Sequence, residues 1–198
     1  MVSLNEKWAH QLAMHNMIPA EDEALYSYGF RQGAVLLLNI ATMLCIGWRM
    51  DMVKESMTFM LTYLPLRRMA GGYHARTQLR CYLLGIVLTI SVLLAVKWLP
   101  WKLPLCSVLL LVSSGIIIWL APVEDQNKPL DEVEKLKYGY RVRQLLTIWG
   151  VAYVCLVILG IQNLAKTLIV SLIIVGIMLL LGKNNIKGRK CICLNAKE

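Results

Sequence analysis

One short stretch of the chain, residues 67–81, carries the two side chains that thiol catalysis needs. His74 lies within it, and Cys81 follows seven residues later, where an apolar run begins. An imidazole that takes the thiol proton and later gives a proton to a leaving amine would make this cysteine a nucleophile. The pair predicts an acyl-transfer site, although a packed Cys and a solvated His are also typical of such positions.

The chain has to bend between these residues for their side chains to meet. On one continuous helix they would share a face but lie about 10.5 Å apart along the axis, and the His74 side chain would lean away from Cys81. Gly71 and Gly72 provide flexibility before the histidine, and Thr77 suits the N-cap of the next helix. We therefore expect His74 in a turn and Cys81 in the early turns of a helix.

Positive charge surrounds the cysteine in this arrangement. The N-terminus of a helix carries a partial positive charge, and Arg76, Arg80 and a protonated His74 add to it. This charge favours the thiolate, the reactive form, whereas burial among apolar groups would oppose it.

Composition indicates that these residues belong to a membrane protein. Hydrophobic residues make up 58% of the 198-residue chain and charged residues 17%, against roughly 25% charged residues in soluble domains. The mean hydropathy is +0.57. These values exclude a disordered chain and argue against a soluble domain. Six cysteines in 198 residues are too sparse for a disulfide-stapled domain. The net charge of +9 is explained by Lys and Arg in cytoplasmic loops, so no nucleic-acid partner is expected.

The apolar runs predict an all-α fold, a polytopic membrane helical bundle with about six membrane helices. Five runs approach the roughly 20 residues that a crossing needs: 33–48, 82–99, 103–121, 145–162 and 164–182. Segment 52–66 is short and carries Lys54 and Glu55, so crossing, re-entry and a surface position all stay open. If it crosses, most Lys and Arg residues fall on the side of both termini. If it does not cross, only the N-terminal segment changes side, so residues 67–81 are expected as a catalytic loop on the cytoplasmic side in either case.

We predict a single membrane domain over residues 1–198, with the lipid bilayer as a partner. Residues 1–31 are predicted to form one or two amphipathic interfacial helices, because an apolar stripe repeats every four residues and a turn is expected near Pro19. Residues 183–198 are predicted to form a basic cytoplasmic tail.

No metal or other cofactor is expected. His10 and His15 are the only other histidines, and the sequence contains no Cys-x-x-Cys pair. Packing is the ordinary interpretation of the cysteines within the predicted spans, which are Cys45, Cys106 and Cys155.

Two motifs resemble the accessory gene regulator B family, the membrane endopeptidases of peptide quorum sensing in Gram-positive bacteria. The first is an Arg, then a Gly-x-His-Ala element, then a Cys, found here as Arg67 or Arg68, Gly72-Tyr73-His74-Ala75 and Cys81. The second is Ala121-Pro122 followed by Asn127-Lys128-Pro129-Leu130. The resemblance covers most of the chain, because its size and span pattern agree as well.

The resemblance implies a multi-pass cysteine endopeptidase of the cell membrane that removes the C-terminal part of a small amphipathic, AgrD-like propeptide. Cys81 would form an acyl-enzyme thioester, with His74 as general base and then general acid. A Cys or Ser of the propeptide would displace the enzyme thiol and close a thiolactone or lactone ring. The supporting or substrate-binding residues would be Arg67, Arg68, Gly71, Gly72, Arg76, Arg80, Lys128 and Pro129.

Several alternatives stay open from the sequence. Glu124, Asp125 or Asn127 could orient His74 from the neighbouring loop. A small transporter or peptide exporter without covalent chemistry is the alternative function, and a non-catalytic membrane scaffold is a third. A homodimer is compatible with a small membrane enzyme.

Overall fold

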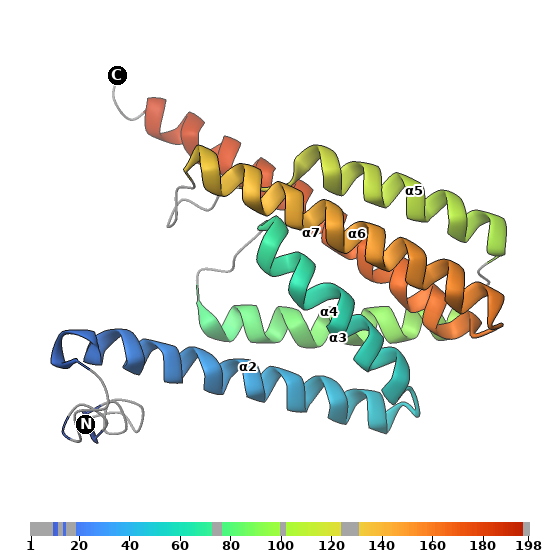
Figure 1. Ribbon diagram of the computed structural model, residues 1–198, viewed down its shortest axis with the longest axis horizontal. Coiled ribbons are helices and arrows are strands. Elements are labelled where there is room, and N and C mark those ends of the chain that lie inside the picture. The colour runs from blue at the N-terminus through green and yellow to red at the C-terminus, as the bar shows by residue number, and fades with distance from the viewer. Residues whose placement is uncertain are drawn as a thin grey trace. The chain divides into compact units, whose positions relative to one another are not determined.

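The computed structural model describes residues 10–11, 14, 19–72, 77–99, 102–123 and 131–195, and no side chains beyond residue 183. Regular structure within these ranges is helical, which confirms the all-α prediction. A 3₁₀ turn, η1 (Ala20–Asp22), precedes the α-helices (Figure 1). They are α2 (Glu23–Arg49), α3 (Val53–Ala70), α4 (Gln78–Trp98), α5 (Leu103–Leu120), α6 (Glu132–Ile158) and α7 (Gln162–Asn195).

Four of the described helices are long and apolar enough to cross a membrane: α2, α4, α6 and the Gln162–Lys183 part of α7. Helix α5 is apolar over a shorter stretch, Pro104–Leu120. On α4, large apolar side chains at helical spacing are exposed, namely Leu83, Val87, Ile90 and Leu94. An outward apolar stripe suits hydrocarbon rather than water. The chain is a helical membrane protein.

The chain contains two compact units, residues 1–42 and residues 43–198. In the first unit, the amide of Asp22 donates to the carbonyl of Pro19 at 3.0 Å, so the expected turn is present at the proline. Helix α2 begins at Glu23 rather than at residue 33, because no proline interrupts the sequence after Pro19. Residues 23–31 of the predicted interfacial segment therefore belong to α2, and the single-domain assignment stays a prediction.

In the second unit, the start of α3 packs against the last turns of α2 at very close range. A Cβ added to Gly47 would lie 2.6 Å from the Cβ of Ser56. The buried Ser56 hydroxyl donates to the Met43 carbonyl at 2.7 Å. The ambiguous segment 52–66 is thus part of an 18-residue helix. Charges at both of its ends keep α3 from being as apolar as the four spans.

Helix α7 is the centre of the second unit. It contacts α3, α4, α5 and α6, and its inward side chains are almost fully buried: Leu168, Ile169, Leu172, Val175 and Leu179. Successive helices from α3 to α7 alternate in direction (Figure 1). The end of α3, the start of α4, the end of α5 and the start of α6 therefore lie at the same end of the bundle.

Helix α4 and helix α5 agree with their predicted spans within a few residues, but α6 and α7 are longer than predicted. Helix α6 begins at Glu132 rather than at residue 145, and α7 continues to Asn195, through most of the predicted tail 183–198. Lys, Arg and Glu are good helix formers, so a helix continues where its apolar run ends. Acidic residues in the first turn of α6, Glu132 and Glu134, also favour a helix N-terminus.

Candidate active site

The last turn of α3 leads into two glycines in the left-handed region. Gly71 has φ +77° and Gly72 has φ +111°, conformations that side-chain-bearing residues rarely adopt. The Val123 amide donates to the Ala70 carbonyl at 2.9 Å, and Gly71 pairs with Val123 in an isolated parallel bridge. A Cβ on Gly71 would overlap the Val123 carbonyl oxygen. Both the backbone conformation and the close contact therefore require glycine at position 71.

Gly72, the next residue, lies close to α7, the central helix of the second unit. A Cβ added there would lie 3.0 Å from Nη1 of Arg67 and 3.1 Å from the Met178 carbonyl oxygen of α7. Val123 itself follows a cis Ala121–Pro122 peptide bond. The structure thus brings the Gly71-Gly72 segment and the Ala121-Pro122 segment, far apart in sequence, against each other.

Cys81 lies in the first turn of α4, nine residues after Gly72 in the chain. Thr77 is the N-cap, with an extended backbone, and its hydroxyl accepts a hydrogen bond of 3.3 Å from the Arg80 amide. The Cys81 amide makes the first helical hydrogen bond, to the Thr77 carbonyl at 3.1 Å. The thiol is free and exposed. The predicted N-cap, and the position of the cysteine one turn into a helix, are both confirmed.

One side chain of α3, Tyr63, lies close to the cysteine. Its hydroxyl is within electrostatic reach of Arg67 on the same helix and of Cys81. Tyr63 is buried and stacks on Phe59, with ring centroids 5.1 Å apart. A buried phenol from α3 therefore lies near the first turn of α4.

The described part of the chain contains six of the ten predicted site residues: Arg67, Arg68, Gly71, Gly72, Arg80 and Cys81. Arg68 and Arg80 are exposed. The other four lie outside the described residues: His74, Arg76, Lys128 and Pro129. The helix break expected between His74 and Cys81 is confirmed, because α3 ends at Ala70 and α4 begins at Gln78.

Sequence reasoning did not single out three residues that border this region: Tyr63, Val123 and Met178. The four-residue spacing between Tyr63 and Arg67 was the only local signal, since such residues share a helix face. Val123 and Met178 approach the two glycines through backbone atoms. The pattern of side chains in the sequence does not indicate such contacts. Within the described residues, no group of three His, Cys, Asp or Glu side chains could hold a metal ion.

Residues 5–182 match the model of one protein family, accessory gene regulator B. The chain belongs to this family. The accessory gene regulator B family is part of the system that processes quorum-sensing autoinducers. The family assignment made from residues 67–81 and 121–130 is therefore confirmed.

Proteins from two genera are similar to this chain at moderate identity. An AgrB-like protein of Clostridium perfringens strain SM101 is 26% identical over 184 residues, which cover 86% of this chain and 83% of the relative. Protein FsrB of Enterococcus faecalis strain OG1RF is 27% identical over 157 residues, or 77% of this chain and 62% of that protein. No solved structure matches the chain significantly.

Proposed function

We propose that this protein is a cysteine endopeptidase of the cell membrane that removes the C-terminal part of an AgrD-like propeptide and promotes its cyclisation. One observation carries the proposal: a free, exposed thiol on the first turn of a capped helix. The thiol lies at the N-terminal end of α4, where the helix dipole is positive. Tyr63 of α3 is within electrostatic reach of both Arg67 and Cys81.

In the proposed reaction, His74 accepts the Cys81 proton while the sulfur attacks the scissile carbonyl. The new C–S bond forms, the C–N bond breaks, and the proton passes from His74 to the leaving amine. The acyl group stays on Cys81 as a thioester. A thiol or hydroxyl within the propeptide then attacks this thioester, closes the ring and releases the Cys81 thiol.

The role of His74 rests on the sequence motif and on chain connectivity. The histidine is two residues from Gly72 and three from Thr77, and an extended chain spans at most about 3.6 Å per residue. Gly72 is held against α7 and Thr77 caps α4, so both anchors of the histidine segment are fixed. The remaining supporting roles, for Arg68, Arg76, Arg80, Lys128 and Pro129, and a cytoplasmic position of the site, are part of the proposal.

A membrane position near the interface supports cyclisation over hydrolysis. A thioester keeps its acyl group activated, so ring closure by the propeptide wins only where water is scarce. Helix α4 exposes a stripe of large apolar side chains that includes Leu79, Leu83 and Val87. Cys81 is therefore level with the start of this stripe along the helix axis, on a different side of the helix.

Co-expression with a cognate propeptide tests the proposal. We expect Cys81→Ala and His74→Ala each to abolish cleavage, with the protein still inserted in the membrane. Cys155→Ala is the matched control, because Cys155 is also free and exposed but lies far along α6. A covalent adduct between a thiol-reactive peptide and Cys81, detected by mass spectrometry, is the direct readout.

The same experiment distinguishes the endopeptidase from the alternative function, a peptide exporter without covalent chemistry. If the protein only moves a peptide across the membrane, Cys81→Ala will leave cleavage and peptide secretion at the wild-type level. That result would overturn the endopeptidase proposal.

A further inference from the structure

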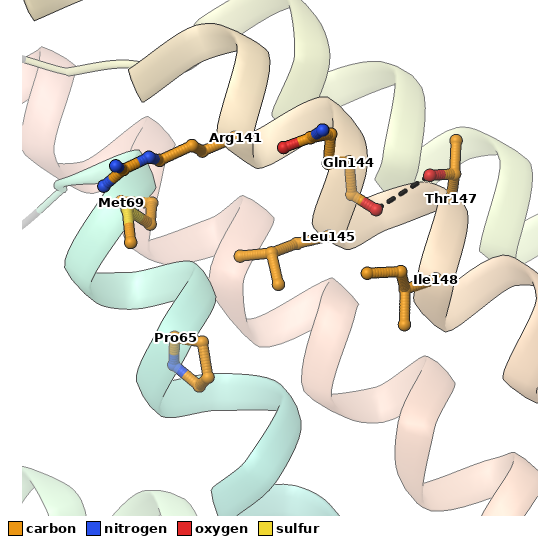
Figure 2. A pocket seen from close by; sticks show the side chains of 7 residues that line it. All are labelled: Pro65, Met69, Arg141, Gln144, Leu145, Thr147 and Ile148. Atoms are coloured by element: carbon orange, nitrogen blue, oxygen red, sulfur yellow. Dashed lines mark hydrogen bonds between the residues drawn. The ribbon is translucent and has the colours of Figure 1, made fainter. Parts of the chain in front are cut away.

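A cavity of about 500 Å³ lies between α3 and α6 (Figure 2). Helix α3 contributes Pro65 and Met69 to its lining. These two residues alternate with Tyr63 and Arg67 along the helix, and a two-residue step rotates a side chain by about 200° around an α-helix. The cavity is therefore on the opposite face of α3 from the Tyr63 side, which borders Cys81.

The α6 wall of the cavity changes from polar to apolar along the helix. Arg141 and Gln144 line the end nearest the start of α6, and Leu145 and Ile148 line the part farther along. Figure 2 shows the Arg141 side chain extending toward Met69 at the end of α3. The change coincides with the point where the charged first half of α6 becomes an apolar span. In a bilayer crossed by this span, Arg141 would lie at headgroup level and Ile148 among the acyl chains.

Arg141 gives the cavity a positive charge, and none of the described lining residues is acidic. The positive charge is therefore not balanced by another described residue of the lining. The acidic residues at the start of α6, Glu132 and Glu134, precede Arg141 by about two helical turns. The nearby hydroxyl of Thr147 is already used, because it donates to the Gln144 carbonyl at 2.7 Å. The cavity therefore complements a ligand with an anionic head and an apolar tail.

We propose that this cavity, a groove between α3 and α6, binds an anionic glycerophospholipid. The phosphate would lie at Arg141 and one acyl chain along Leu145 and Ile148. Basic pockets between membrane helices are typical binding sites for anionic lipid headgroups. An acidic peptide would also match the charge of Arg141, but the groove lies on the face of α3 away from Cys81. A chain segment being cut at that sulfur would therefore occupy the other face.

The proposal depends on the helical bundle spanning a bilayer and is independent of the chemistry at Cys81. Its functional consequence concerns α3. The bound lipid would contact both α6 and Met69, which lies in the last turns of α3. It would therefore stabilise the position of the helix end that leads into Gly71.

Native mass spectrometry of the purified full-length protein in detergent tests the site. We expect the wild type to retain phosphatidylglycerol in preference to phosphatidylcholine. Arg141→Gln should retain phosphatidylglycerol about fivefold more weakly, the loss expected for one interfacial cation. Arg143→Gln is the matched control, since Arg143 is exposed on the same helix and does not line the cavity.

A second variant tests the acyl part of the groove independently of charge. Ile148→Trp fills the apolar end and should also lower phosphatidylglycerol retention, while Val154→Trp, at an exposed α6 position outside the lining, should not. Glycerol phosphate, the headgroup without chains, should compete poorly if both parts of the groove bind. Thermal unfolding in lipid-free detergent identifies any variant that has lost its fold.

Three outcomes would overturn the proposal. Equal losses in Arg141→Gln and Arg143→Gln would show general surface electrostatics rather than a site. Wild-type retention in both Arg141→Gln and Ile148→Trp would remove the groove as the place of binding. Displacement of phosphatidylglycerol by an acidic apolar peptide, but not by excess phosphatidylserine, would assign the groove to a peptide instead.

Discussion

The two ends of α3 are held by contacts of different kinds. At the first end, the Ser56 side chain packs against the backbone of Gly47 and donates to the Met43 carbonyl. At the other end, Gly71 lies against the backbone of Val123 in a loop-to-loop contact. The first contact packs one helix against another, whereas the loop contact sets the position of one short segment. We therefore expect damage at the first end to lower stability and damage at the second to lower activity.

Among the variants that compare the two ends of α3, Gly71→Ala is expected to have the largest effect. The left-handed backbone alone costs an alanine roughly 1–3 kcal/mol, and the added Cβ overlaps the Val123 carbonyl oxygen. We expect propeptide cleavage to fall by at least about tenfold, more than the fall in thermal stability would explain. Gly115→Ala is the control, because a Cβ there meets nothing within 4 Å. Full activity of Gly71→Ala would show that the loop contact does not position the site.

A smaller effect, and a different one, is expected for Gly47→Ala. Its Cβ would lie 2.6 Å from the Ser56 Cβ, and overpacking of this kind costs about 1–3 kcal/mol. The thermal unfolding temperature in detergent should fall, while the folded fraction cleaves the propeptide at the wild-type rate. Gly150→Ala, also in open space, serves as the control. Loss of activity without loss of stability would remove the distinction between the two ends.

The smallest effect is expected for Thr77→Ala, which removes the N-cap of α4 beside the loop. Loss of a capping hydroxyl costs about 1 kcal/mol, so we expect a few-fold lower cleavage rate, with Thr77→Ser restoring it. Thr58→Ala is the control, because its hydroxyl donates within α3, to the Lys54 carbonyl, and caps nothing. If Thr77→Ser is as impaired as Thr77→Ala, the capping hydrogen bond does not explain the role of this residue.

Features that depend on neighbouring residues were predictable from the sequence. Thr77 was identified as an N-cap because hydroxyl side chains suit that position, and the structure confirms it. The break between α3 and α4 followed from Gly71 and Gly72 for the same local reason. The apolar runs located the spans, but they did not locate helix ends, since charged residues continue α6 and α7 beyond the apolar sequence.

Features that depend on distant segments were not predictable. Nothing in residues 67–81 indicates that Val123 and Met178 supply backbone contacts to the two glycines, because those partners are tens of residues away. The status of segment 52–66 was ambiguous for a related reason. Its charges weaken the hydropathy signal of α3, and only its buried face, including Phe59 and Leu66, shows that it belongs to the packed bundle.

The contact between Gly72 and the Met178 carbonyl has a consequence for biosynthesis. Helix α7 is translated after the other described helices, yet it supports a segment encoded some hundred residues earlier. A nascent chain released before α7 is complete would carry the thiol but lack this support. The sulfur would therefore acquire its final surroundings only once α7 has been made, so the protein would become reactive later than its first helices enter the membrane.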